Sequence, residues 1–304
     1  MSTPGVECNI CGWRGASFLP LRSPGHSQED QNVYCPVCGS YERHRALAEY
    51  LRRENVLDSL GDVLEVGSGL VTAYRRMVQQ CGNRYVSLDL WPGFSDVQGD
   101  IVQSPFGSGA FDTVLCSHVL EHVADDFQAL HEVRRIVKPS GLVVFQLPFD
   151  DERFETIECS EGPSAAIGSG YFYGHAREYG LDLIERLRCF WPAVLEVQPL
   201  TVIDSAAAAM YGFDKNFGTF LFCETQPRTH PLPGQLYRDL LPLKRRWTIR
   251  RRAHEISLTR CGEGGALDDW LAAEKEVLAS EQEFCGRNVY EILGRIGRAR
   301  PLGE

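Results

Sequence analysis

The stretch Val63-Leu-Glu-Val-Gly-Ser-Gly69 decides the fold. A short apolar run enters a turn that holds two glycines, and glycine has no side chain to keep a ligand away from the backbone. Asp89 follows Gly69 by twenty residues and ends the next apolar run. A carboxylate at that place can bind both hydroxyls of an adenosine ribose. The stretch therefore predicts a nucleoside-cofactor site at the carboxyl end of a parallel sheet.

Short apolar runs alternate with amphipathic stretches from Asp62 onward, which is the pattern of a parallel sheet covered by helices. The expected strands are 63–66, 85–88, 113–116, 142–147, 194–197 and 219–223. The expected helices are 45–54, 70–80, 124–137 and 176–189. The pattern predicts an α/β domain.

The turn and the motifs after it indicate which of two classes of nucleoside cofactor the site binds. A nicotinamide site usually has a third glycine, whereas this turn reads Gly67-Ser-Gly-Leu-Val-Thr72. Three motifs follow: Gly99-Asp-Ile-Val-Gln-Ser-Pro-Phe106, Phe111-Asp-Thr-Val-Leu-Cys-Ser-His-Val-Leu-Glu-His-Val123 and Val137-Lys-Pro-Ser-Gly-Leu-Val-Val-Phe145. With them, residues 57 to 225 resemble a class I S-adenosylmethionine-dependent methyltransferase, of the group that includes ubiquinone and menaquinone biosynthesis enzymes. The resemblance implies a doubly wound, seven-stranded, mostly parallel Rossmann-like sheet.

The resemblance also implies a cofactor site for S-adenosylmethionine (SAM). It places the two glycines of the turn around the methionine part, Asp89 on the ribose and Asp100 on the adenine. The implied set is Glu65, Gly67, Ser68, Gly69, Asp89, Leu90, Asp100, Ile101 and Ser117. For Glu65, a capping or water-binding role is an equal alternative.

Methyl transfer from a sulfonium needs alignment and exclusion of water more than acid–base catalysis, because the leaving thioether is neutral. A hydroxyl or protonated amine acceptor still requires a base. We expect His118 and His175 in this role and assign His122 to the start of the following helix. An alternative is that His118, Glu121 and His122, at i, i+3 and i+4, hold a divalent metal.

Two absent patterns narrow the acceptor. Cys116-Ser-His-Val119 occupies the place where similar enzymes carry an Asn/Asp-Pro-Pro-aromatic turn for a planar amine. The exocyclic amines of nucleic-acid bases are therefore disfavoured as methyl acceptors. There is also no Pro-Cys pair for attack on a pyrimidine ring, and Cys116 is interpreted as a small core residue.

An insertion, residues 148 to 174, carries Gly168-Ser-Gly-Tyr-Phe-Tyr-Gly174, which predicts a lid over the substrate. The next element, His175-Ala-Arg-Glu-Tyr179, is similar to the H-x-R-x-Y element of zinc-knuckle-bearing bacterial methyltransferases. The resemblance implies that Arg177 and Tyr179 bind substrate. The alternative is a helix N-terminal cluster that holds the loop, with Arg177 paired to a loop carboxylate.

Two C-x-x-C pairs near the start of the chain predict a structural zinc site, because tetrahedral zinc needs four thiolates from two tight turns. The ligands are Cys8, Cys11, Cys35 and Cys38. Each pair ends in a glycine, Gly12 or Gly39, which permits the left-handed backbone of such turns. The alternatives are reduced core cysteines or a redox pair. Arg43, His44 and Arg45 are interpreted as a solvated or domain-docking helix face.

The tail begins with the proline-spaced linker 227–234. The run Lys244-Arg-Arg-Trp-Thr-Ile-Arg-Arg-Arg252 then suggests nucleic acid. Its continuation resembles a small bacterial helical domain of unknown function, although Ser257 replaces the usual first Trp. The resemblance implies two helices with Trp270 packed inside, as an interaction module. We predict three domains, 1–56, 57–226 and 227–304.

Composition limits the partners. The 304 residues carry a net charge of -10, and the acidic body does not attract a phosphate backbone. No apolar run approaches the roughly 18 to 20 residues that span a bilayer, and no signal segment opens the chain, so we expect a cytoplasmic protein without membrane contact. The leading hypothesis is a zinc-containing SAM-dependent methyltransferase acting at oxygen or nitrogen of a small-molecule or sugar-linked acceptor. The alternatives are a ribosomal or transfer RNA methyltransferase and a non-catalytic SAM-binding scaffold with a protein partner on its tail.

Overall fold

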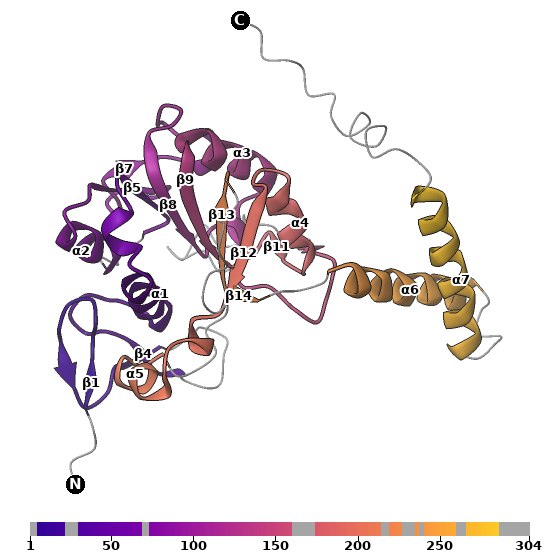
Figure 1. The fold of residues 1–304 in the computed structure, drawn as a ribbon, viewed down its shortest axis with the longest axis horizontal. Coiled ribbons are helices and arrows are strands. Elements are labelled where there is room, and N and C mark those ends of the chain that lie inside the picture. Colours follow the sequence, from indigo (N-terminus) through magenta and orange to yellow (C-terminus); the bar gives the residue numbers. More distant parts are fainter. Residues whose placement is uncertain are drawn as a thin grey trace, which may run out of the picture. The chain divides into compact units, whose positions relative to one another are not determined.

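The chain divides into two units, Met1–Tyr237 and Arg238–Glu304, in a computed structural model of the protein (Figure 1). The structure describes residues 5–21, 30–68, 73–159, 174–213, 219–226, 235–236, 240–259 and 266–285. Gly69, most of the expected lid (160–173) and the linker 227–234 lie outside the described residues.

A mixed sheet organises the first unit, with strand order β14-β12-β13-β9-β8-β5-β6-β7. Its strands are β5 (Val63–Val66), β6 (Tyr85–Asp89), β7 (Val97–Gln98), β8 (Phe111–Ser117), β9 (Val137–Gln146), β12 (Ala193–Val197), β13 (Phe220–Glu224) and β14 (Gln235–Leu236). The five strands from β5 to β9 run parallel, and β13 is antiparallel to both of its neighbours. The predicted doubly wound, mostly parallel sheet is confirmed, and the two-residue β14 extends it at one edge.

The strand order reverses at β5, which pairs with β6 on one side and β8 on the other. Val63 lies opposite Tyr85 in β6 and opposite Thr113 in β8, so the carboxyl ends of the three strands meet at one edge. Ligands of open α/β sheets bind in the crevice at such a switch point. The glycine turn after β5 opens directly onto this edge.

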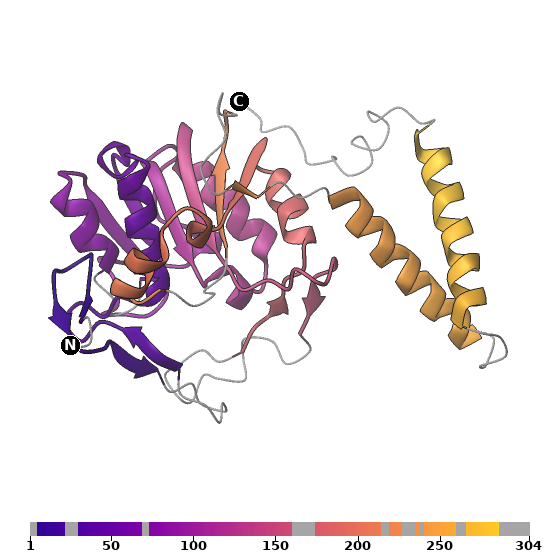
Figure 2. The same cartoon turned by 60° about the horizontal axis from the view of Figure 1, so that its bottom comes forward.

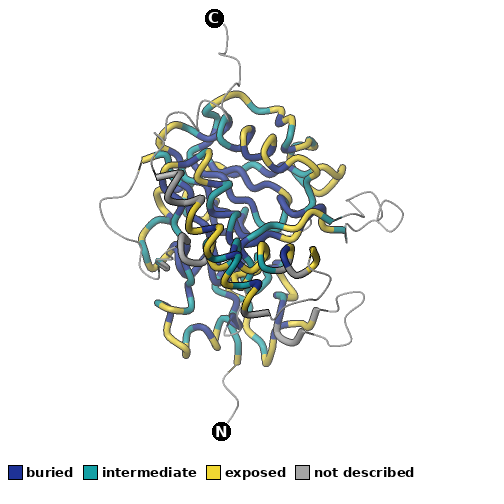
Figure 3. The backbone as a smooth tube through the Cα atoms, turned by 90° about the vertical axis from the view of Figure 1, so that its right-hand side faces the viewer, coloured by how far each residue is buried: buried dark blue, intermediate teal, exposed yellow. Residues whose placement is uncertain are grey.

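Helices cover both faces of the sheet (Figures 1 and 2). On one face, α1 (Glu42–Arg53) and α2 (Ala73–Gln80) contribute Leu47 and Met77 to a core that also holds Val144 of β9. The next residue of β9, Phe145, points to the opposite face and packs edge-on against Trp191, which follows α4 (Asp182–Arg188). Helix α3 (Asp126–Ile136) also contacts β9. The central strands are buried on both faces (Figure 3), as their continuous apolar sequences require.

The N-terminal segment shares its core with the sheet domain. Two hairpins, β1 (Val6–Glu7) with β2 (Arg14–Gly15) and β3 (Leu19–Leu21) with β4 (Asp30–Tyr34), precede α1. Phe18 belongs to the same buried cluster as Phe222 of β13. The segment therefore packs on the sheet domain through α1 and through α5 (Ser205–Met210).

Arg45 joins these parts from a fully buried position. Its guanidinium lies 3.7 Å above the centre of the Phe18 ring. It donates hydrogen bonds to the carbonyl oxygens of Ser40 (2.6 Å), Val33 (3.0 Å), Tyr211 (2.6 Å) and Gly212 (3.0 Å). Burial lowers the pKa of Arg45 to about 10, so the group stays charged at neutral pH. The predicted basic helix face is a docking contact within the chain.

Replacing Arg45 by methionine should lower the free energy of unfolding by about 3–5 kcal/mol, because the four carbonyls lose a buried partner. Guanidinium unfolding followed by circular dichroism measures the change. Arg14→Met is the control, since the Arg14 side chain is 77% exposed and forms a surface ion pair with Glu7. Equal stability of the two variants would refute the role given to Arg45.

Three of the expected helices begin at other residues than predicted. The helix expected at 45–54 already begins at Glu42, as α1. The helix expected at 176–189 starts only at Asp182, because Arg177–Glu178 form a strand, β11, that pairs with β10 (Ile157–Glu158). The helix expected at 124–137 starts at Asp126, where the side chain of Asp125 accepts a hydrogen bond from the Gln128 amide (2.9 Å). Strand β9 begins immediately after it. The helix expected at 70–80 is described from residue 73 onward, as α2 (Ala73–Gln80).

The described residues of the second unit form two helices, α6 (Leu240–Thr259) and α7 (Ala266–Cys285). Ile249 and Ile256 of α6 pack with Ala273 and Val277 of α7, and Trp270 lies against this cluster as expected. No helix among the described residues of either unit combines the length and apolar character needed to cross a bilayer.

Candidate functional site

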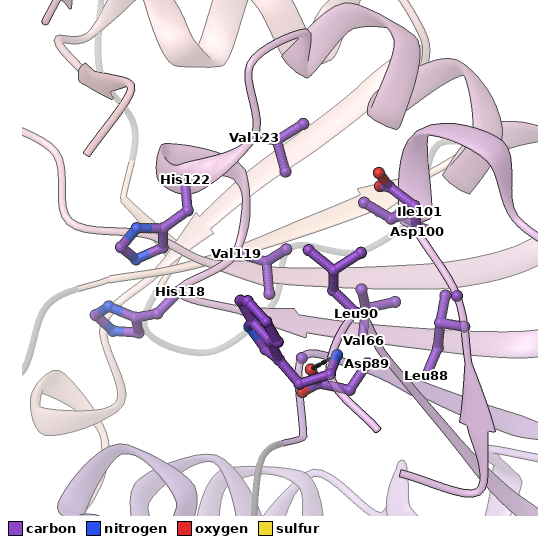
Figure 4. A pocket seen from close by; sticks show the side chains of 13 residues that line it. Val66, Leu88, Asp89, Leu90, Asp100, Ile101, His118, Val119, His122 and Val123 are labelled. Atoms are coloured by element: carbon purple, nitrogen blue, oxygen red, sulfur yellow. Dashed lines mark hydrogen bonds between the residues drawn. The ribbon is translucent and has the colours of Figure 1, made fainter. Parts of the chain in front are cut away.

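A pocket of about 260 Å³ lies at the carboxyl ends of β5, β6 and β8. Figure 4 shows the side chains that line it. They come from the turn after β5, the end of β6, the 3-10 helix η2 (Ile101–Gln103) and the 3-10 helix η3 (Leu120–His122). The pocket therefore lies at the switch point of the sheet, where the sequence predicted a nucleoside site.

Six of the predicted site residues meet at this pocket: Gly67, Asp89, Leu90, Asp100, Ile101 and His118. The walls also contain residues that were not predicted from the sequence to line the nucleoside site: Val66, Leu88, Trp91, Gly99, Val119, His122 and Val123. Glu65, Ser68 and Ser117 are not among the lining residues. The Ser68 hydroxyl instead donates to the carbonyl oxygen of Phe94 (3.1 Å), which closes the loop after β6 against the glycine turn.

The backbone conformation at position 67 and the closeness of Val119 both require a glycine there. The φ of Gly67 is +71°, and a Cβ atom added there would lie 2.4 Å from Cγ2 of Val119. Its amide donates to the carbonyl oxygen of Leu88 (2.8 Å), which fixes the turn to β6. A side chain at this position would therefore strain the turn and displace Val119 from the pocket wall.

We expect Gly67→Ala to weaken the binding of S-adenosylhomocysteine by at least about tenfold, the equivalent of 1.4 kcal/mol. The measurement is a calorimetric titration of folded protein. Gly107→Ala is the matched control, because Gly107 has an ordinary φ and nothing lies within 4 Å of its added Cβ. Unchanged affinity in Gly67→Ala would contradict the position given to the turn.

Two carboxylates line the pocket from neighbouring loops. One oxygen of Asp89 accepts a hydrogen bond from the Trp91 amide, and one oxygen of Asp100 accepts from the Val102 amide, each at 3.0 Å. Asp100 is also the N-cap of η2. Each carboxylate is thus oriented by a hydrogen bond from the backbone amide two residues later. Such acceptors suit hydroxyl and amine groups of a nucleoside.

Glu65 is turned away from the pocket. Its carboxylate is buried and accepts a hydrogen bond from the hydroxyl of Tyr85. Burial raises the pKa of Glu65 to about 7, and the bond from Tyr85 opposes this shift. This geometry favours a structural role over direct contact with a cofactor, with the Tyr85 hydroxyl in place of the expected cap or water.

Glu65→Gln should change how stability depends on pH. The folded pKa lies above the usual value of 4.5, so burying the ionised form costs nothing below pH 4.5 and its full amount above pH 7. Relative to wild type, the variant should gain about 3 kcal/mol of unfolding free energy between pH 4.5 and pH 8. Urea unfolding of both proteins at these two pH values checks this. A constant difference would show that Glu65 does not carry the shift.

Three histidines come together beside the pocket. His118 adopts a left-handed backbone with φ of +53°, a conformation that costs a non-glycine residue roughly 1–2 kcal/mol. His118 and His122 both line the pocket, and the exposed His175 has its ring centre 4.9 Å from that of His122. His122 belongs to η3 and precedes α3 by four residues, so it is a wall residue and not the start of that helix.

Arg177 and Tyr179, predicted to bind substrate, are both buried and engaged within the protein. The guanidinium of Arg177 donates to three carbonyl oxygens and to the carboxylate of Glu158, and all three of its nitrogens take part. The hydroxyl of Tyr179 donates to Asp126 (2.9 Å). These contacts favour the alternative in which the element holds the loop, with Glu158 as the loop carboxylate.

The four N-terminal cysteines form a cluster suited to zinc. Their sulfur atoms all lie within 4.8 Å of one another, and the pairs Cys8–Cys38 and Cys11–Cys35 are 3.6 Å apart. Tetrahedral zinc with Zn–S bonds of about 2.3 Å separates its sulfurs by about 3.8 Å, so the donor set fits. Hydrogen bonding from the Cys38 thiol lowers the pKa of Cys8 to about 4.

The turns of the cluster have the predicted geometry, with φ of +76° at Gly12 and +69° at Gly39. His44 is not a ligand, because its Nδ1 accepts a hydrogen bond from the Tyr41 amide (3.1 Å) at the start of α1. Burial lowers the pKa of His44 well below its usual range, which keeps it a neutral acceptor.

Comparison with known proteins agrees with the fold. Residues 64–145 match the methyltransferase-domain family. The chain is 35% identical over 136 residues to a malonyl-[acyl-carrier protein] O-methyltransferase of Serratia marcescens, covering 40% of this chain and 52% of that protein. It is 28% identical over 137 residues to a demethylmenaquinone methyltransferase of Lysinibacillus sphaericus, covering 44% and 49%. The chain thus spans about half the length of these two relatives.

Among solved structures, a SAM-dependent methyltransferase of Mesorhizobium loti shares 18% identity and a TM-score of 0.40, covering 58% of this chain and 96% of that one. The family match begins within β5 and ends within β9, so it contains the glycine turn, both pocket carboxylates and η3. Over these residues the chain is therefore similar to the methyltransferase-domain family.

Proposed function

We propose that the protein transfers a methyl group from SAM to an oxygen or nitrogen of a small-molecule or sugar-linked acceptor. The observation that carries the proposal is the meeting of Asp89, Asp100 and His118 in one pocket at the switch point of the sheet. SAM, when bound, supplies an electrophilic methyl group.

Each wall of the pocket has a role in this proposal. Asp89 accepts hydrogen bonds from the ribose hydroxyls and Asp100 from the adenine amine, while Leu90 and Ile101 contact the apolar faces of the base. Gly67 permits close approach of the methionine part. His118 lies at the end of β8, where it can orient the acceptor or take its proton.

The relatives support the acceptor class. The names of the two curated relatives describe methylation of a malonyl-acyl-carrier protein oxygen and of demethylmenaquinone. Asp89 and Asp100 line the pocket and neither lysine nor arginine is among its lining residues, which disfavours a phosphate-bearing acceptor there. Zinc at the four-cysteine cluster is proposed as a structural ion that stabilises the N-terminal segment. The second unit is proposed as a protein-docking module.

Transfer of label tests the acceptor class. Protein is incubated with methyl-labelled SAM and separate small-molecule, RNA and protein fractions of a bacterial lysate, with Asp89→Ala as the inactive control. We expect enzyme-dependent label in the small-molecule fraction. Label in RNA that falls steeply with salt would establish the RNA alternative, and SAM binding without transfer to any fraction would establish the scaffold alternative.

A further inference from the structure

We propose that Glu121, His122 and His175 bind a divalent first-row metal ion beside the nucleoside pocket. Their ligand atoms, one from each side chain, all lie within 4.8 Å of one another. Two imidazoles and one carboxylate form a ligand set that proteins use for such ions while leaving coordination positions open for other ligands. This site is separate from the four-cysteine cluster, which has no open position.

Glu121 is the strongest evidence. Its side chain is 1% exposed, and neither carboxylate oxygen accepts a well-aligned hydrogen bond from a described residue. Nδ1 of His118 lies 3.3 Å from Oε1, and this contact is an ion pair only when the histidine is protonated. Burying a carboxylate without hydrogen bonds costs several kcal/mol, in order of magnitude. A bound cation would remove this cost, which explains why an acidic residue occupies this position.

His122 is oriented as a metal ligand. Its Nδ1 lies 3.1 Å from the carbonyl oxygen of Gly174. A carbonyl can only accept, so Nδ1 carries the proton, and the lone pair of the neutral ring lies on Nε2. Histidine ligands usually donate their second nitrogen to a carbonyl or carboxylate in this way, because the bond fixes the ring and its tautomer.

The backbone brings His175 to η3, although more than fifty residues separate it from Glu121 in the sequence. The amide of Ala176 donates to the carbonyl oxygen of Glu121 (2.7 Å). Arg177 then donates to the carbonyls of Leu120 (3.1 Å) and Val123 (2.5 Å). These bonds hold the two residues that follow His175 against η3 and against Val123, the residue after it. Arg177 is therefore a positioning residue for the metal ligand.

The position of the site suggests its chemistry, and this step rests on the proposed methyl transfer. His118 and His122 line the pocket together with Asp89 (Figure 4), so an ion at this cluster would face the acceptor side. An acceptor hydroxyl bound to the ion would lose its proton to water more readily. Its oxygen lone pair would form the new C–O bond as the S–CH₃ bond breaks, and the bonding electrons would leave with sulfur as a neutral thioether.

Manganese binding tests the site without methyl transfer. The full chain, brought to one zinc per molecule by dialysis against a chelator, is titrated with Mn²⁺, and free Mn²⁺ is measured by electron paramagnetic resonance. We expect one Mn²⁺ per chain, with affinity reduced at least about tenfold in His175→Ala and in Glu121→Gln. His131→Ala is the matched control, because His131 is exposed on α3 outside the cluster.

The exposed position of His175 keeps its variant folded, which circular dichroism and an unchanged zinc content verify. No Mn²⁺ binding by wild type, or equal affinity in wild type and His175→Ala, would overturn the metal site. S-adenosylhomocysteine binding is measured on the same samples. Retained nucleoside binding without Mn²⁺ binding rejects only the metal site, whereas Mn²⁺ binding without nucleoside binding rejects only the proposed function.

Discussion

Asp89→Ala should reduce the affinity for SAM by about 100-fold or more. Asp89 lies at the end of β6 in the pocket, and the Trp91 amide holds one of its oxygens. A carboxylate that accepts two ribose hydroxyls contributes hydrogen bonds worth about 1.5–3 kcal/mol each, and every 1.4 kcal/mol is a factor of ten in affinity. Calorimetric titration of the purified variant measures the loss. Its fold should be unchanged, because Asp89 belongs to the pocket wall and not to the core.

Asp58→Ala is the matched control for this experiment. Asp58 is exposed in a short 3-10 helix, Leu57–Ser59, and does not line the pocket. Its variant should bind SAM as the wild type does. A fall of less than threefold in Asp89→Ala would mean that the ribose binds elsewhere and that the pocket is misassigned.

Cys38→Ser should release the proposed zinc and destabilise the first unit by several kcal/mol. Structural zinc sites in small peptides contribute about 10–16 kcal/mol of binding free energy, all of it available to folding. Cys38 is buried, and its sulfur lies 3.6 Å from that of Cys8. Because Cys8 and Cys38 belong to the same core as Leu47, loss of the ion should also loosen α1. Zinc content and thermal unfolding measure the two effects.

Cys189→Ser is the control for the zinc variant. Cys189 is an exposed free cysteine after α4, and its thiol donates to the carbonyl oxygen of Glu185 (3.4 Å). Zinc content and melting temperature should both remain at wild-type values. Retention of zinc and of stability in Cys38→Ser would show that the cluster holds no structural metal.

The sheet and the nucleoside pocket could be predicted from the sequence because their signals are local. Val63–Val66 is an apolar strand followed at once by Gly67, and Asp89 ends the next apolar run. In a parallel sheet, these ends must meet at the same edge. The cluster of four cysteines could also be predicted from the two C-x-x-C pairs, since four thiolates at that spacing converge in two tight turns.

The histidine cluster and the role of Arg177 depend on pairing that no local pattern encodes. The sequence shows His118, Glu121 and His122 at helical spacing, but the residues fold as a left-handed junction and a 3-10 turn. His175 joins them only because β11 pairs with β10 and Ala176 bonds to Glu121. The H-x-R-x-Y element consequently resembled a substrate site, whereas its arginine is buried against carbonyl oxygens.

Arg45 illustrates the same limit of local patterns. A basic residue in a helix usually faces solvent, and its neighbours Arg43 and His44 gave no contrary signal. The partners that bury it, Tyr211 and Gly212, lie more than 160 residues away in the sequence. Burial of a charged group by such distant carbonyls becomes visible only when the chain is folded.

The most direct test of the central claim is a calorimetric titration of the zinc-loaded protein with SAM and S-adenosylhomocysteine, beside a nicotinamide dinucleotide. We predict micromolar binding of both sulfur nucleosides at one site per chain and no binding of the dinucleotide. Failure of a folded, zinc-loaded sample to bind either sulfur nucleoside would contradict the assignment of the pocket and with it the proposed methyl transfer.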